Sequence, residues 1–138
     1  MIIYSLFLNN LIVYTMYKLK FGYFSDDKYN YSVDMMIEYI NEHKPPKIKL
    51  NVKDLLFNLN WDSLENNIKP KDILKDIENF KTEEIRIKRA DMKYPIIIDS
   101  NYNIIDGVHR YMKHILKYKT HINVYIFNKA LMKRFIIN

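Results

Sequence analysis

The residues best suited to chemistry form the run Asp106-Gly107-Val108-His109-Arg110, which joins an apolar stretch to an amphipathic one. A glycine between a strand and a helix lets the backbone approach a ligand closely. The first turn of the helix offers unpaired N–H groups and the positive end of its dipole, which suit a phosphate. Because His109 and Arg110 add side-chain donors there, the run predicts a phosphate or nucleotide site from Gly107 through Val108 to Arg110.

Two neighbours of this run are further candidates. Asp106 could orient His109, hold a metal–phosphate complex or accept a proton, but it could equally stabilise its own turn and cap the helix. Lys113 lies one helical turn after His109, so it either reaches the same ligand or is a solvated surface lysine. The histidines show no metal-ligand spacing, so no protein metal site is predicted.

The elements around this run alternate between strand and helix. Alternating apolar residues predict a strand at 47–51, and short apolar runs predict strands at 95–99, 103–105 and 121–127. Helical spacing predicts helices at 33–43, 70–80, 83–90 and 108–118, with Ser32 and Thr82 as N-caps and Pro70 as a first residue. Asn51 is expected to cap a helical turn that runs to residue 59. Residues 58–67 are predicted to form a loop, and residues 130–137 a short helix or a closing strand. The order predicts an α+β fold, with a small mixed sheet and flanking helices.

The composition sets limits on function. The chain has 138 residues, a formal charge of +6, 49% hydrophobic residues and no cysteine. Disulfides, thiolate metal sites and cysteine nucleophiles are therefore excluded, and a reducing, cytoplasmic location is expected. The basic charge favours an anionic partner, although AT-rich codon usage explains the lysine content equally well. No G-x-x-x-x-G-K-[ST] loop is present, which excludes a P-loop NTPase.

The first seventeen residues carry no charged side chain. They are too short for a spanning helix and are interrupted by Asn9-Asn10, so no membrane association is expected. A hairpin turning at these two asparagines is predicted, with a single long strand as the alternative. We therefore expect an N-terminal extension over residues 1–44 and a domain over residues 45–138.

The segment Tyr94-Pro-Ile-Ile-Ile-Asp99, followed by Ile104-Ile105-Asp106-Gly107-x-His109-Arg110, a helix and the strand 121–127, resembles the ParB/sulfiredoxin-like nucleotide-binding superfamily. The likeness is to stand-alone D-G-x-H-R members. It implies that the turn and its helix hold the phosphates of ATP or ADP, with CTP as an alternative, together with Mg²⁺. It also implies that Arg89 contacts phosphate and that Asp91 helps to bind substrate or metal.

The departures from that superfamily narrow the expected function. Val108 stands where sulfiredoxin has its catalytic cysteine, which excludes sulfinic acid reduction. Residues 128–138 are too few for the helix-turn-helix domain of chromosome-partition members. The first hypothesis is a kinase or NTPase acting on a small molecule, with Asp106 or Asp91 as base and His109 on the phosphate. The alternatives are a non-catalytic nucleic-acid-binding or nuclease-like module, and a structural homodimer formed by the N-terminal hairpin.

Overall fold

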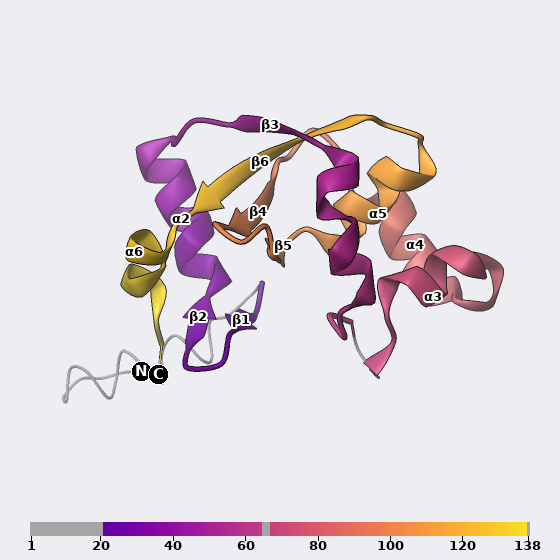
Figure 1. Ribbon diagram of the computed structural model, residues 1–138, viewed down its shortest axis with the longest axis horizontal. Coiled ribbons are helices and arrows are strands. Elements are labelled where there is room, and N and C mark those ends of the chain that lie inside the picture. The colour runs from indigo at the N-terminus through magenta and orange to yellow at the C-terminus, as the bar shows by residue number, and fades with distance from the viewer. Residues whose placement is uncertain (1–20, 65–66, 138) are drawn as a thin grey trace. The chain divides into compact units, whose positions relative to one another are not determined.

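The computed structural model describes residues 21–64 and 67–137 (Figure 1). The chain divides into two compact units, one formed by its two ends and one by Pro46–Phe127. The predicted α+β class is confirmed. The division falls close to the expected boundary after residue 44, but residues 128–137 join the first unit instead of the second. The predicted hairpin within residues 1–17 lies outside the described residues.

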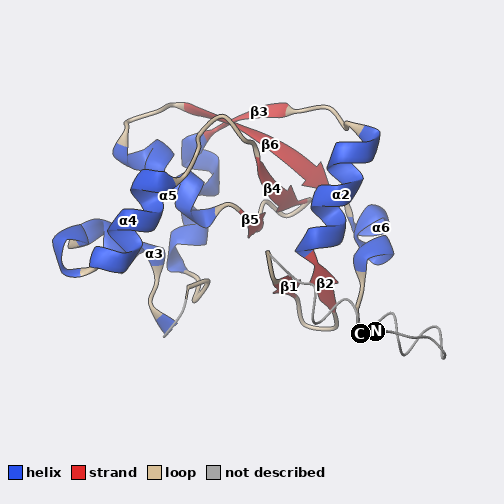
Figure 2. Cartoon of the chain, turned by 180° about the vertical axis from the view of Figure 1, so that it is seen from behind, coloured by secondary structure: helices blue, strands red, loops and turns tan. Residues whose placement is uncertain are grey.

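The second unit contains a four-stranded mixed sheet, drawn in red in Figure 2. Its order is β3 (Ile48–Asn51), β6 (His121–Phe127), β4 (Ile96–Asp99) and β5 (Ile104–Asp106). β6 runs parallel to β4 and antiparallel to β3, and β5 runs antiparallel to β4. The four predicted strands are all present, each within a residue of its expected bounds, because their alternating or fully apolar patterns match a half-buried edge and a buried centre.

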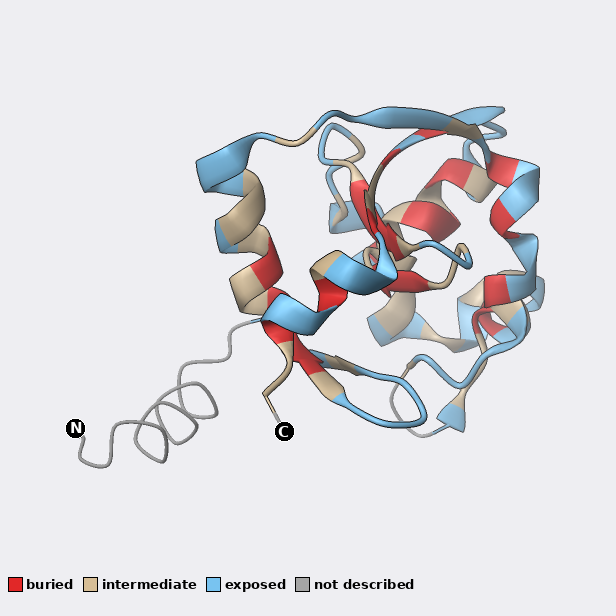
Figure 3. Cartoon of the chain, turned by 60° about the vertical axis from the view of Figure 1, so that its left-hand side comes forward, coloured by how far each residue is buried: buried red, intermediate tan, exposed pale blue. Residues whose placement is uncertain are grey.

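One face of this sheet packs against η1 (Val52–Asn60), a 3₁₀ helix, and α5 (Val108–Leu116). The first hydrophobic cluster formed there consists of Val52, Leu55, Ile96, Ile98, Ile104, Tyr111, Ile122 and Val124. Buried residues are red in Figure 3. Each fully buried aliphatic side chain contributes about 1.5–3 kcal/mol of transfer free energy. The buried Tyr111 hydroxyl donates to the Val52 carbonyl oxygen at 2.7 Å. Burial, reinforced by the Asp54 carboxylate, raises the pKa of Tyr111, so its hydroxyl keeps its proton.

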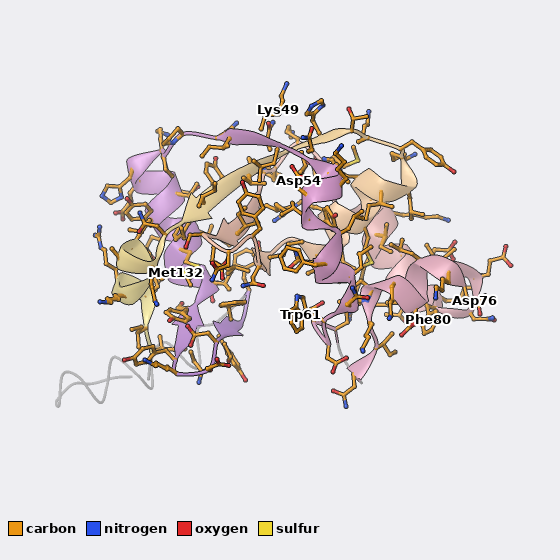
Figure 4. The ribbon with its side chains drawn as sticks, viewed as in Figure 1. Lys49, Asp54, Trp61, Asp76, Phe80 and Met132 are labelled. Atoms are coloured by element: carbon orange, nitrogen blue, oxygen red, sulfur yellow. The ribbon has the colours of Figure 1, made fainter. Side chains whose placement is uncertain are left out.

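A second cluster forms where α3 (Pro70–Lys75) and α4 (Lys81–Arg89) meet α5, around Ile73, Ile87 and Met112. Pro70 begins α3, as predicted. The single helix predicted over 70–80 is wrong, because α3 ends at Lys75 and the short 3₁₀ helix η3 (Ile77–Asn79) follows. Asn79 donates to the Asp76 carboxylate at 2.7 Å, a local side-chain bond that competes with helix continuation. Figure 4 labels Asp76. Thr82 is no N-cap, since α4 begins before it.

Asn58 lies at the start of the predicted loop but is a buried residue of η1. Its side-chain amide donates to the carbonyl oxygens of Leu55 at 3.0 Å and Tyr102 at 2.9 Å. Its side-chain oxygen accepts from the Ile104 N–H at 2.9 Å. One side chain therefore ties η1 to the turn between β4 and β5, and satisfies groups that burial would otherwise leave unpaired.

Replacing Asn58 with Ala should destabilise the protein by about 2 kcal/mol or more, because the Ile104 N–H and two carbonyls lose their partner. Denaturant unfolding measures the change in the free energy of unfolding. Asn60→Ala is the matched control, since Asn60 is exposed in the same 3₁₀ helix. Equal losses in the two variants would contradict a special role for Asn58.

The first unit combines a short hairpin with helices from both ends of the chain. β1 (Tyr23–Ser25) pairs with β2 (Asn30–Ser32), and α2 (Val33–His43) follows. Ser32 caps α2 as predicted, since its hydroxyl accepts from the Met35 N–H at 3.1 Å. The C-terminal segment forms α6 (Lys129–Met132) and the 3₁₀ helix η4 (Lys133–Phe135), and then bridges to Tyr31 through Ile136. The short helix expected for 130–137 is therefore present, and the alternative of a closing strand is not, since Ile136 forms only a single bridge.

Asp26 organises the hairpin turn. Its carboxylate accepts from the Tyr31 hydroxyl at 2.6 Å and from the backbone N–H groups of Lys28 and Tyr29, each at 2.8 Å. The Tyr31 hydrogen bond, with help from the two backbone bonds and the Lys28 charge, lowers the pKa of Asp26 below its ordinary 3.8. The carboxylate therefore stabilises the folded hairpin above pH 3.8, and this contribution is lost as the pH falls through the lowered pKa.

Tyr31→Phe should raise the pKa of Asp26 towards 3.8, since it removes the hydrogen bond that lowers that pKa most. Acid unfolding of the hairpin should then begin at a higher pH than in the wild type. Titration of the Asp26 carboxyl carbon by NMR measures the pKa directly. Tyr29→Phe keeps the backbone bond to Asp26 and should leave the pKa unchanged, whereas an equal pKa in Tyr31→Phe and wild type would contradict the assignment.

Candidate functional site

A cavity of about 340 Å³ opens at the start of α5, within the second unit. It is lined by Arg86, Arg89, Ala90, Asp91, Asp106, Gly107, Val108, His109 and Arg110. All the site residues predicted from the sequence line this cavity except Lys113. The structure therefore brings the D-G-x-H-R turn and the end of α4 to one place, although they are about twenty residues apart in the sequence.

The turn from β5 into α5 depends on Gly107. Its φ of 108° lies in the left-handed region that favours glycine. A Cβ built at this position would lie 2.5 Å from Cγ2 of Ile96 and 2.8 Å from Nη2 of Arg110. The missing side chain therefore allows the turn to rest directly on β4, and leaves room for the Arg110 guanidinium above it.

Arg110 folds back over this turn. Its Nη2 donates to Oδ2 of Asp106 at 3.1 Å, and about a fifth of its side chain is exposed. The Nε is buried and has no acceptor in the part of the chain that the structure describes. A buried donor without a partner costs about 1–3 kcal/mol, and a cation at a helix N-terminus opposes the dipole. An anion in the cavity would relieve the second of these penalties.

Asp106 does not cap α5. The N-cap is Gly107, which provides no side chain, and the Asp106 carboxylate is used to hold Arg110. The alternative that Asp106 caps the helix is therefore wrong. No side chain among the described residues caps the first turn of α5, and Val108 and His109 of that turn line the cavity. The Val108 side chain itself packs against both hydrophobic clusters, so only its backbone is suited to contact a ligand.

Glu83, which the sequence did not single out, connects two residues of the cavity. Its carboxylate accepts from Nη1 of Arg86 at 3.2 Å and lies 2.7 Å from Nε2 of His109. Only 12% of the Glu83 side chain is exposed. The His109 ring is thus oriented by α4, and not by a ligand alone. The pairing with Arg86 follows from their i,i+3 spacing, but the contact with His109 arises only when α4 packs on α5.

Lys113 has a different role from the predicted one. Its Nζ donates to the carbonyl oxygens of Lys88 at 2.8 Å and Ala90 at 2.7 Å, at the end of α4. The last carbonyls of a helix have no partner within it, and a cation there also complements the dipole. Lys113 therefore stabilises the C-terminus of α4, and the prediction that it contacts phosphate is not supported, since it does not line the cavity.

Arg89 and Asp91 lie at the exposed side of the cavity. The Arg89 guanidinium makes no hydrogen bond or ion pair with the described residues, whereas the other two cavity arginines each pair with a carboxylate. Oδ1 of Asp91 accepts from the Lys93 N–H at 3.0 Å and so shapes the turn after α4. About half of the Asp91 side chain remains exposed, which leaves this carboxylate accessible to a ligand.

No family model, curated protein or solved structure matches this chain. Among residues 21–64 and 67–137, no group of three or more His, Cys, Asp or Glu side chains is arranged to hold a metal ion. The same residues include no helix with the length and apolar character needed to cross a membrane. The site itself is a small cavity lined by three arginines and two carboxylates at the N-terminus of α5.

Gly107→Ala should destabilise the protein by roughly 2 kcal/mol or more, because left-handed φ costs about 1 kcal/mol and overpacking against Ile96 adds about 1–3 kcal/mol. Thermal or denaturant unfolding measures the loss. Gly22→Ala is the matched control, since Gly22 also has a positive φ, 83°, but no atom within 4 Å of an added Cβ. If the two variants lose equal stability, the close approach to Ile96 contributes nothing.

Proposed function

We propose that this chain binds a nucleotide, ATP or ADP with Mg²⁺, with its phosphates in the cavity at the start of α5. The same segment carries the resemblance to ParB/sulfiredoxin-like proteins, so sequence pattern and cavity favour one place. The proposed ligand is an intracellular metabolite, which is consistent with the cytoplasmic location expected from the sequence. CTP is the alternative nucleotide, because nothing in the cavity selects a base.

The observation that carries the proposal is the Arg110 side chain. Its buried Nε lacks an acceptor among the described residues, and its Nη2 lies 2.8 Å from where a Cβ on Gly107, the N-cap of α5, would stand. Arginine presents its donors in a planar fork that matches two phosphate oxygens. A phosphate here would accept from the Arg110 guanidinium, complement the helix dipole and offset the charge of Arg89.

The metal that accompanies a nucleotide fits the cavity only in part. Mg²⁺ prefers oxygen ligands and is usually held by one or two carboxylates together with substrate phosphates and water. The cavity offers Asp91 and Asp106, but Asp106 is engaged by Arg110. Asp91, with its exposed carboxylate, is the residue that would contact the metal. When bound, Mg²⁺ would neutralise charge on the phosphates.

Phosphoryl transfer to the hydroxyl of a small molecule is the reaction that these residues would support. It requires positioned phosphates and charge neutralisation more than covalent chemistry. Arg110 and the α5 N-terminus would supply the neutralisation, and His109, oriented by Glu83, would contact a phosphate oxygen. Asp91 suits the role of base better than Asp106, since Asp106 accepts the hydrogen bond that positions Arg110, but Asp91 fills that role only when it does not bind the metal.

Arg110→Met should weaken nucleotide binding about tenfold to a hundredfold, the loss expected for one or two hydrogen bonds to a charged group. Thermal shift with ATP, ADP and CTP, each with and without Mg²⁺, measures the ligand stabilisation. At 100 times the dissociation constant this stabilisation is about 2.7 kcal/mol for the wild type.

Two further variants complete the experiment. Arg110→Lys keeps the charge but loses the fork, so its affinity should lie between those of wild type and Arg110→Met. Lys75→Met changes an exposed cation on α3 and should bind like the wild type. A folded Arg110→Met variant with wild-type affinity would place the nucleotide elsewhere, and the absence of any shift with all three nucleotides would refute nucleotide binding.

A further inference from the structure

The turn between α5 and β6 carries an aromatic residue where a helix end favours glycine. The N–H of Tyr118 donates to the Ile115 carbonyl at 3.0 Å, and the N–H of Lys119 donates to the His114 carbonyl at 2.9 Å. These two bonds form a Schellman motif, which requires a left-handed residue at the position of Tyr118. Its φ is 55°, a conformation that costs an L-residue about 1 kcal/mol and glycine almost nothing.

The Tyr118 ring gives the fold nothing that offsets this cost. The residue is 91% exposed, the most exposed of the large apolar and aromatic residues that the structure describes as exposed. A tyrosine normally buries much of its area or finds a partner for its ring. Both faces of this ring are open to solvent, so the side chain is explained better by binding than by folding.

Lysines surround the turn. Lys117 and Lys119 flank Tyr118 and are exposed. The Val52 N–H donates to the Thr120 carbonyl at 2.9 Å, which places the exposed Lys53 beside the turn.

The neighbouring sheet edge adds another lysine. In the pairing of β3 with β6, Asn51 lies opposite His121 and Lys49 opposite Asn123. These four exposed residues share the sheet face that points away from the first hydrophobic cluster, since Leu50 and Ile122 between them pack into it. Figure 4 labels Lys49 and also Asp54, an acidic residue close to this edge.

We propose that the surface formed by Lys49, Lys53, Lys117, Tyr118 and Lys119, here called the Tyr118 surface, binds single-stranded nucleic acid. Lysines along such a surface attract the phosphate backbone, and an exposed aromatic ring stacks on a base. A base can stack on Tyr118 only when its own face is uncovered, which a duplex prevents. This proposal is independent of the nucleotide cavity, because the surface and the cavity share no residue.

The test measures fluorescence anisotropy of a labelled single strand of about twenty nucleotides, with the matching duplex and anionic vesicles as competitors. Tyr118→Gly should keep a melting temperature at or above that of the wild type, since it relieves the left-handed strain. It should weaken single-strand binding about fivefold to a hundredfold, the range expected for loss of one stacked base. Tyr23→Thr is the control, because Tyr23 is 61% exposed but lies in the other unit.

Replacing Lys117 and Lys119 with Gln should lower the slope of log affinity against log salt by about 1.4, or 0.7 for each lost phosphate contact. The double variant Lys75→Gln, Lys133→Gln removes two exposed lysines elsewhere and should leave the slope unchanged. Arg110→Met should bind the single strand like the wild type, which separates this proposal from the nucleotide site.

Three results would overturn the proposal. The first is equal affinity of wild type and Tyr118→Gly for the single strand. The second is a duplex that competes as well as the single strand, which would show attraction by charge alone. The third is a lack of binding to the oligonucleotide at low salt, whether or not the protein binds the vesicles. The lysines would then have a role other than binding nucleic acid, or none.

Discussion

The contact between the Gly107 backbone and the Ile96 side chain is the constraint on which the second unit depends. It fixes where α5 starts and how closely it approaches β4. Successive residues of α5 then reach in different directions. His109 hydrogen-bonds with Glu83, Arg110 with Asp106, and Tyr111 with the Val52 carbonyl oxygen. These three bonds all depend on where α5 begins. If the sequence of α5 were shifted by one residue along the helix, each of these side chains would point about 100° away from its present partner.

The D-G-x-H-R site could be predicted because its information is local. A glycine after an apolar strand and before an amphipathic helix indicates a close turn, and residues in a first helical turn necessarily lie near its N–H groups. The cavity therefore contains the residues expected from that run. The role of Glu83 could not be predicted in the same way. It is 26 residues from His109, and their contact depends on how α4 packs against α5.

The errors share a physical cause, which is competition between side chains for backbone groups. Lys113 has the spacing of a phosphate ligand, but the carbonyls at the end of α4 are nearer and need a partner. Asn58 is of a residue type common in loops, yet its side-chain amide forms hydrogen bonds with three backbone groups, two carbonyls and one N–H. A sequence pattern predicts that such polar residues lie in loops or bind ligands. In the fold, these two instead form hydrogen bonds with backbone groups that would otherwise be unpaired.

The two ends of α5 carry different weight as evidence for function. Lysines beside the C-terminus of a helix are favourable to the helix itself, so Lys117 and Lys119 alone would indicate little. There the unexplained residue is Tyr118, which occupies a glycine position without packing. At the N-terminus the sign is reversed, because Arg110 lies where the α5 dipole disfavours cations, whereas Arg89 ends α4, where the dipole favours them. Packing and hydrogen bonds among the described residues explain neither the left-handed tyrosine at one end of α5 nor the buried, unpartnered Nε of Arg110 at the other.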